Sequence, residues 1–157
     1  GAAARGQVLH LFGRVRDAGG KAVAEARVEM WQADADGRYH HPRETKGAAD
    51  PGFQGYGQTD TDDEGRFQFR TIRPVAYSGR PPHIHFAVSG PGFPRCTTQM
   101  YVAGAAGNER DFILNGISDP KARASLIVAF EPAPDIEAGA IKGHFEIVLA
   151  HNAVVPA

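Results

Sequence analysis

The sequence has little of several residue types and patterns that mark particular classes of protein. It holds a single cysteine, Cys96, so it forms no disulfide within the chain and no zinc site built from several thiolates. No apolar run approaches the ~20 residues that a membrane-spanning helix needs. The formal net charge is only -1, from 17 basic and 18 acidic residues. Such a balance gives no support for nucleic-acid binding or for electrostatic attachment to a membrane.

The single cysteine does not determine the cellular compartment of the protein. One free thiol suits the cytosol, which is the favoured location, but it does not exclude export. A chain of 157 residues fits one domain, which we expect to extend over residues 1–157.

Glycine and proline are plentiful, and they predict an all-β fold. The 19 glycines and 11 prolines fall between short apolar stretches, which is typical of short strands joined by turns. Asp119 and Pro120 favour one short helix over Asp119–Ile127, as its N-cap and first residue. We therefore expect a two-sheet β-sandwich with long active-site loops and one short helix. The predicted strands are Val8–Val15, Val23–Trp31, Thr59–Asp63, Arg66–Arg70, Ile84–Val88, Thr97–Val102 and Gly143–Ala150.

The stretch Tyr77–Phe86 contains the clearest functional pattern. In an extended segment the side chains at positions i and i+2 lie on one face, so His83 and His85 can reach one metal ion. The two prolines that precede the pair favour an extended backbone and resist helix. Tyr77 and Arg80 add a phenol oxygen and a fixed positive charge close by.

A metal held by two histidines needs further ligands, and this segment offers no carboxylate. No acidic residue lies between Tyr77 and Gln99, so neither a two-histidine-one-carboxylate site nor a cupin-like site is complete here. Tyr77 offers a phenolate instead. A phenol with a pKa of about 10 ionises at neutral pH only beside a strong Lewis acid, and ferric iron fits that requirement better than zinc or ferrous iron.

Two stretches then resemble the signatures of the intradiol ring-cleavage dioxygenases, the family of the catechol and protocatechuate dioxygenases. One is Val28–Tyr39, and the other is Arg80–Phe86 with Tyr77 upstream. Family-like character extends from Gly13 to Leu149. Two separate signatures in the right order make this resemblance specific. It implies an oxidoreductase of aromatic hydrocarbon catabolism that acts on a small catecholic substrate and O2.

The resemblance implies a non-haem Fe(III) cofactor held by two tyrosines and two histidines. By position in the motifs, Tyr39 is the equatorial and Tyr77 the axial tyrosinate. His83 is the equatorial and His85 the axial histidine. The implied reaction inserts both atoms of O2 into the ring. It cleaves the ring between the two hydroxylated carbons and gives a cis,cis-muconate-type dicarboxylate.

The resemblance also implies roles in catalysis and in substrate binding. Tyr77 takes a proton from the catechol as it binds, and Arg80 stabilises negative charge that develops on the ring. Gln99 matches a pocket residue that assists Arg80, although a polar strand residue is nearly as good an interpretation. Trp31 flanks the substrate, whereas a core anchor is the default for a lone tryptophan.

The remaining histidines and arginines carry weaker signals. His10 and His144 lie in alternating strands and read as ordinary sheet residues. A carboxylated substrate needs a nearby cation, for which the candidates are Arg38, Arg43 and Arg73, each more typical of a solvent-exposed arginine.

The chain differs from the family in two ways. The connection from Tyr77 to Arg80 is short, and we expect the chain to lack the N-terminal helical region of catechol-type members. We therefore expect a minimal single-domain member. The sequence leaves its substrate and oligomeric state open, and a homo-oligomer is compatible with it.

Two other classes of protein remain as alternatives. The segment Gly13–Val28 also resembles the opening of transthyretin-like and carboxypeptidase-regulatory binding modules. Those modules hold no iron, so this reading predicts a colourless protein that tolerates Tyr39→Phe. The third hypothesis is a cupin-like enzyme whose metal is held by the histidine pair and a distant carboxylate. It predicts that Tyr77→Phe leaves iron binding intact.

Overall fold

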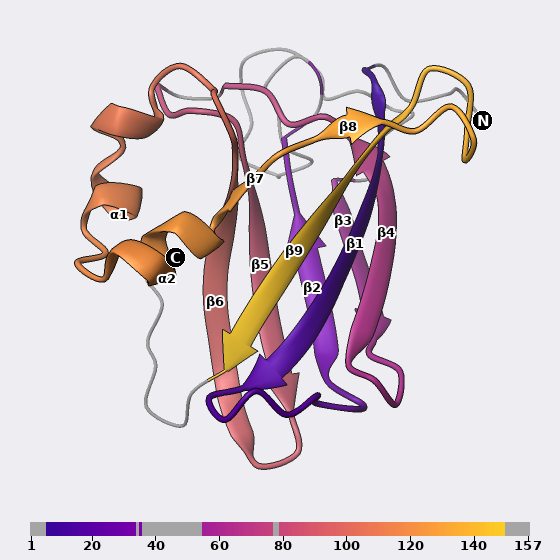
Figure 1. Ribbon diagram of the computed structural model, residues 1–157, viewed down its shortest axis with the longest axis vertical. Coiled ribbons are helices and arrows are strands. Elements are labelled where there is room, and N and C mark those ends of the chain that lie inside the picture. The colour runs from indigo at the N-terminus through magenta and orange to yellow at the C-terminus, as the bar shows by residue number, and fades with distance from the viewer. Residues whose placement is uncertain (1–5, 34, 36–54, 77–78, 150–157) are drawn as a thin grey trace.

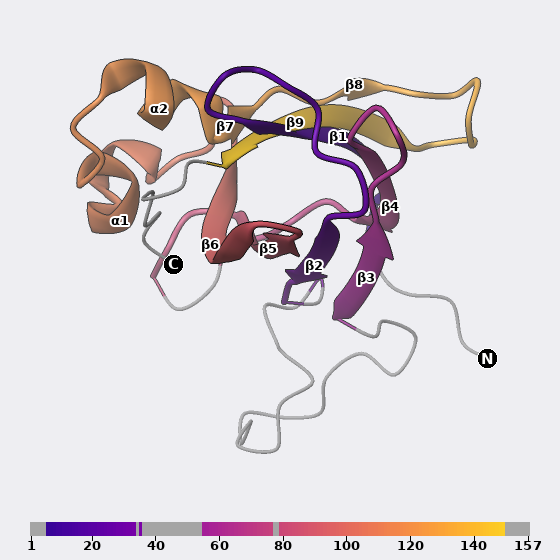
Figure 2. The same ribbon diagram turned by 90° about the horizontal axis from the view of Figure 1, so that it is seen from below.

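Two β-sheets pack face to face in the computed structural model, which describes residues 6–33, 35, 55–76 and 79–149. Figure 2 shows the two layers, with the helical segments beside β6 and β7 at one side. The strands are β1 (Val8–Asp17), β2 (Arg27–Trp31), β3 (Tyr56–Asp60), β4 (Arg66–Ile72), β5 (His83–Gly90), β6 (Phe93–Val102), β7 (Ile127–Val128), β8 (Glu131–Pro132) and β9 (Ile141–Leu149) (Figure 1). The helical segments are η1 (Asn108–Arg110), α1 (Phe112–Asn115) and α2 (Pro120–Ser125).

Both sheets are mixed. One has the strand order β4-β1-β9-β8 and the other the order β3-β2-β5-β6-β7. β1 pairs with β4 in antiparallel and with β9 in parallel orientation, and β5 lies antiparallel between β2 and β6. The predicted two-sheet β-sandwich is confirmed.

The core fills the space between the sheets because the apolar side chains at alternate strand positions point toward the opposite sheet. In β4 the burial alternates along Arg66–Arg70, with Phe67 and Phe69 buried and their neighbours exposed. These two rings meet Phe86 of β5 at centroid distances of 6.3 and 6.4 Å, and Phe86 meets Phe145 of β9 at 5.2 Å. Such tilted aromatic pairs join the two layers.

Most strand predictions hold for their centres and differ at their ends. The predicted strand Thr59–Asp63 shares only Thr59 and Asp60 with β3, and β7 and β8 were not predicted. β2 begins at Arg27 rather than Val23, because Glu25 adopts a positive φ of 58° that breaks the extended backbone. Val28 and Met30 of this strand are buried in the core. The predicted helix is confirmed over Pro120–Ser125, with the Asp119 carboxylate accepting from the Lys121 backbone N–H. Two helical turns, η1 and α1, were not predicted.

Within the described parts of the chain, no helix is long and apolar enough to cross a bilayer.

Candidate functional site

The two histidines of the HxH pair lie at the beginning of β5 and share one face of the sheet. Ile84 between them is fully buried in the core, so the pair faces the other way, as the i, i+2 spacing predicts. Their ring centroids are 4.9 Å apart, with the rings edge-on at 80°. Opposite them, β6 places Tyr101 beside His83 and Gln99 beside His85. The site therefore forms at the end of the sandwich where β5 begins and β6 ends (Figure 1).

Both imidazoles are held neutral, which leaves each with a lone pair for a metal. Burial lowers the pKa of His83, and the nearby Arg80 charge acts in the same direction. Burial, followed by the electrostatic effects of His83 and Arg80, lowers the pKa of His85 to about 4. His83 Nδ1 lies 2.8 Å from the carbonyl oxygen of Pro81. Because a carbonyl only accepts, Nδ1 carries the proton, and Nε2 keeps the lone pair that a metal would use.

Arg80 brings its guanidinium group directly to this pair. Nη1 lies 3.2 Å from His83 Nε2, while Nη2 donates to Gln99 Oε1 at 2.6 Å and to Tyr101 Oη at 2.9 Å. Arg80 is thus a fixed cation beside the lone pair of His83, as its place in the sequence suggested.

Gln99 is an inward-pointing residue of the site and not a surface residue of the strand. Its side chain is buried, and Nε2 lies 3.3 Å from His85 Nδ1. Since Oε1 receives the hydrogen bond from Arg80, the amide of Gln99 connects the guanidinium group to the second histidine.

Asp111 belongs to the same cluster, although it was not predicted from the sequence. Its carboxylate accepts from Arg80 Nε at 2.9 Å, from Arg80 Nη2 at 3.2 Å and from Tyr101 Oη at 2.8 Å. Burial tends to raise the pKa of Asp111, but the hydrogen bonds from Arg80 and from the Leu114 backbone outweigh it and hold this pKa below its usual range. An unpaired buried carboxylate is costly, which makes Asp111 and Arg80 an obligate pair. The sequence feature that could have indicated Asp111 was an acidic residue just before a short apolar stretch.

Tyr101 is a protonated phenol in this network. Burial, together with the hydrogen bond to Asp111, raises its pKa. The described tyrosine nearest the histidines, with its ring 6.4 Å from that of His83, is therefore unsuited to bind a metal as a phenolate.

Trp31 ends β2 against the histidine pair. Its ring stacks on that of His85 at a centroid distance of 6.2 Å and an angle of 12°, and the Arg95 guanidinium carbon lies 5.9 Å from the Trp31 ring centroid. Trp31 is only half-buried, so it borders the site rather than anchoring the core.

Several predicted residues lie outside the described residues or away from the pair. Tyr39, Tyr77, Arg38 and Arg43 are outside the described ranges, so their predicted roles stay predictions. Within those ranges, no three His, Cys, Asp or Glu side chains cluster to hold a metal. The described residues contribute two histidine donors, and further ligands must come from elsewhere.

The structure also places three residues with weaker sequence signals, Arg73, His10 and His144. Arg73 is exposed, with its guanidinium carbon 6.0 Å from the ring centroid of Phe130. His10 bonds Glu137 at 2.9 Å, and His144 bonds Glu146 at the same distance. Both histidines are sheet residues, as expected.

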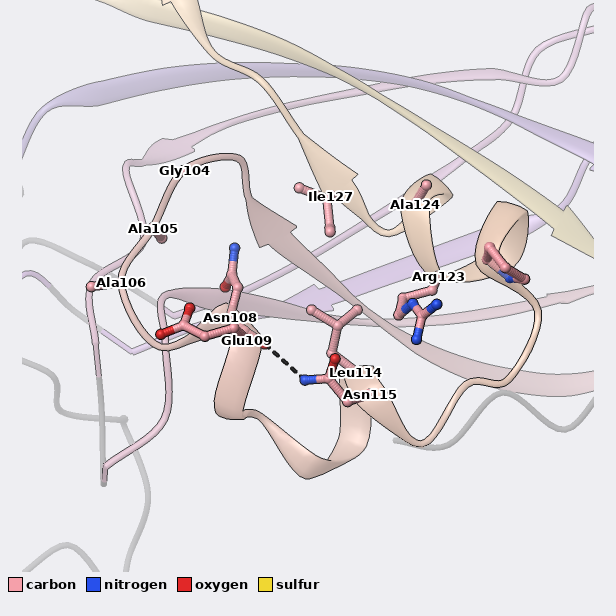
Figure 3. Close-up of a pocket in the computed structure, with 11 residues that line it drawn as sticks. Gly104, Ala105, Ala106, Asn108, Glu109, Leu114, Asn115, Arg123, Ala124 and Ile127 are labelled. Carbon is pink, nitrogen blue, oxygen red and sulfur yellow. Dashed lines mark hydrogen bonds between the residues drawn. The ribbon is translucent and has the colours of Figure 1, made fainter.

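A separate pocket of about 520 Å³ lies among the helical segments, and it includes none of the predicted catalytic residues (Figure 3). Across it, Asn115 Nδ2 donates to the backbone oxygen of Asn108 at 2.9 Å. Its lining comprises Gly104, Ala105, Ala106, Asn108, Glu109, Leu114, Asn115, Pro120, Arg123, Ala124 and Ile127. This pocket is therefore distinct from the histidine site.

Comparisons with known proteins agree on one family. The Dioxygenase family model matches residues 2–81 and 77–151. The protocatechuate 3,4-dioxygenase beta chain of Burkholderia cepacia is 41% identical over 160 residues, which cover 96% of this chain and 68% of that protein. Catechol 1,2-dioxygenase 2 of Acinetobacter lwoffii is 37% identical over 117 residues, 63% of this chain and 41% of the relative.

Solved structures share the fold as well. The dioxygenase domain of a dioxygenase carbohydrate-binding protein fusion from Streptomyces sp. SirexAA-E gives a TM-score of 0.72 at 30% identity, covering 96% of this chain and 84% of that chain. The chain is thus similar in length to that domain, but it spans only about two fifths of the catechol relative.

Proposed function

The chain belongs to the intradiol ring-cleavage dioxygenase family, and from that premise we propose that it cleaves a catecholic ring with O2 at a non-haem Fe(III) centre. Both atoms of O2 enter the product, and the ring opens between the two hydroxylated carbons to give a cis,cis-muconate-type dicarboxylate. The observation that carries this proposal is the neutral pair of His83 and His85 with Arg80 beside it.

The described donors fit this cofactor. His83 Nε2 keeps its lone pair because Nδ1 is engaged with the carbonyl of Pro81, and His85 is neutral at physiological pH. We assign Tyr39, Tyr77, His83 and His85 as the residues that would hold the iron. When bound, ferric iron supplies Lewis acidity that favours the catechol dianion and draws electron density from its ring.

The protein's own groups handle the proton and the charge. Tyr77 Oη takes one of the two protons that the catechol loses on becoming a dianion, and a solvent hydroxide takes the other. Arg80 compensates the negative charge that this leaves on the ring, and such compensation is strongest where water is excluded. A metal at His83 Nε2 would take the lone pair that Arg80 Nη1 now contacts, and Nη1 would then be available to the substrate.

Two further residues shape the substrate position. Gln99 fixes Arg80 through the 2.6 Å hydrogen bond to Nη2, and Trp31, stacked on His85, offers a flat apolar wall to an aromatic ring. Among the curated relatives, one is named for protocatechuate and another for catechol, so the substrate class proposed here is the shared catechol ring.

Product analysis with labelled oxygen tests this proposal. The Fe(III)-loaded protein is given catechol, protocatechuate and hydroxyquinol under 18O2, and the products are identified by mass spectrometry. We expect an intradiol dicarboxylate with two labelled oxygens from at least one substrate. His83→Ala should abolish turnover, whereas His144→Ala, at an exposed position of β9, should retain it. A semialdehyde from cleavage outside the hydroxylated carbons, or a single labelled oxygen, would contradict the proposal.

A further inference from the structure

Among the residues that the structure describes, the carboxylate of Asp111 is a buried charge with an unusually full set of hydrogen bonds. Its side chain is 1% exposed, against 20% for that of its partner Arg80. Oδ1 accepts from Arg80 Nε, and Oδ2 accepts from Arg80 Nη2, from Tyr101 Oη and from the backbone N–H of Leu114 at 3.0 Å. Four hydrogen bonds on two oxygens fix the position of this group.

These bonds also determine which guanidinium nitrogen faces the histidines. The Asp111 carboxylate accepts hydrogen bonds from both Nε and Nη2 of Arg80. Gln99 and Tyr101 accept further hydrogen bonds from Nη2. A guanidinium group is planar and rigid, so fixing this edge directs the remaining nitrogen. That nitrogen is Nη1, and it lies 3.2 Å from His83 Nε2.

The carboxylate reaches the site from a different part of the fold. Asp111 precedes α1 in the connection between β6 and β7, 31 residues from Arg80 in sequence. Tyr101, at the β6 end of the same connection, bonds to the carboxylate and to Arg80. The connection between β6 and β7 is therefore linked to the histidine pair through the Asp111–Arg80 ion pair.

We infer that Asp111 is the positioning residue that, with Tyr101, aims Arg80 Nη1 at the histidine pair. The catalytic consequence rests on the proposed function, in which Arg80 meets the anionic substrate. Asp111 bonds Arg80, Tyr101 and the Leu114 backbone, so its effect on the geometry at the histidines passes through Arg80.

Asp111 also has a structural role, so the variants must separate the positioning of Arg80 from this second role. It is the N-cap of α1, through the bond from the Leu114 N–H. Asparagine caps helices about as well as aspartate, so Asp111→Asn keeps the cap while it removes the charge that holds Arg80. The matched control is Asp119→Asn, because Asp119 caps α2 in the same way and is not among the hydrogen-bond or ion-pair partners of Arg80.

Steady-state kinetics on the iron-loaded protein test the catalytic consequence. We expect Asp111→Asn to lower kcat by roughly tenfold to a hundredfold, since small displacements of a positioned group have effects of that order. The iron content and visible band should stay unchanged. In an Arg80→Gln background, Asp111→Asn should change kcat by less than about twofold, because paired residues are non-additive. Asp119→Asn should match the unaltered chain.

Full kcat in Asp111→Asn, or a loss that only follows lost iron, would overturn the inference. The same holds for an undiminished effect of Asp111→Asn in the Arg80→Gln background, since Asp111 would then act by another route.

A readout on the metal-free protein tests the orientation without any turnover. In 1H–15N NMR spectra the Arg80 Nε–H should be slow to exchange with water in the unaltered chain and in Asp119→Asn, and fast in Asp111→Asn. Equal exchange in all three would refute the positioning role. If the unaltered chain cleaves no catechol, the proposed function fails, and this measurement still decides how Arg80 is held.

Discussion

At the scale of single residues, protonation states define what the site can bind. Burial keeps His83 and His85 neutral and Tyr101 protonated, while the bonds from Arg80 keep Asp111 ionised. The site therefore pairs one cation with one buried anion and leaves two imidazoles as metal donors. Their neutrality has a measurable consequence in the metal-free protein.

The stability of the metal-free protein should fall as the pH drops from about 6.5 to about 4. The pKa of His85 is lowered from 6.5 to about 4 in the folded chain, so the unfolded chain binds its proton first. The stabilisation is complete above pH 6.5 and is lost towards pH 4, by as much as about 3 kcal/mol. His83 acts in the same direction.

Urea unfolding at a series of pH values measures this effect. His85→Gln should show a shallower loss of stability across the same window. An identical pH dependence in both proteins would show that His85 is not held neutral by the fold.

Sequence alone predicted these histidines better than their surroundings. The i, i+2 spacing placed His83 and His85 on one face because strand periodicity is local. Asp111 was missed because its partner Arg80 lies 31 residues away, and no local pattern links an ion pair that only the tertiary fold brings together. The four-residue α1 that it caps is too short for a helical apolar pattern.

At the scale of elements, β1 is the strand on which its sheet depends, because it pairs with both β4 and β9. Gly13 lies at its centre, opposite Phe67 and Phe145. A Cβ at Gly13 would collide with the Phe67 ring and lie 2.6 Å from the backbone oxygen of Phe145. The ring can shift only into a filled core, and the backbone oxygen belongs to the neighbouring strand.

Gly13→Ala should therefore lower the free energy of unfolding by about 1–3 kcal/mol, the usual effect of overpacking. Gly57→Ala in β3 is the matched control, since its nearest contact would be an ordinary 3.4 Å to the Phe69 ring. Thermal unfolding of both variants checks this. Equal midpoints for the two variants would show that β1 adapts to the added methyl group.

The strands were the easiest elements to predict from the sequence, because alternation and turn residues are local signals. β4 follows its Phe-Gln-Phe alternation closely. β2 was predicted to begin too early because nothing in the apolar pattern marks Glu25 for a positive φ, a conformation that non-glycine residues seldom adopt.

At the scale of the whole molecule, the sandwich supports a site at one end, where residues distant in sequence meet. Binding modules and enzymes share sandwich folds, so the architecture alone does not establish an iron centre. Family membership favours the enzyme, and the alternative of a non-enzymatic module differs from it in one physical property. The enzyme must bind ferric iron through phenolates, which absorb visible light when they do so.

The visible absorption spectrum, before and after catechol is added without oxygen, tests this central claim most directly. We predict a broad tyrosinate-to-iron charge-transfer band that shifts to longer wavelength with catechol. Tyr77→Phe should weaken the band, and Tyr56→Phe, at an exposed position of β3, should leave it unchanged. A protein that stays colourless after Fe(III) is supplied would contradict the dioxygenase account and favour a binding module without iron.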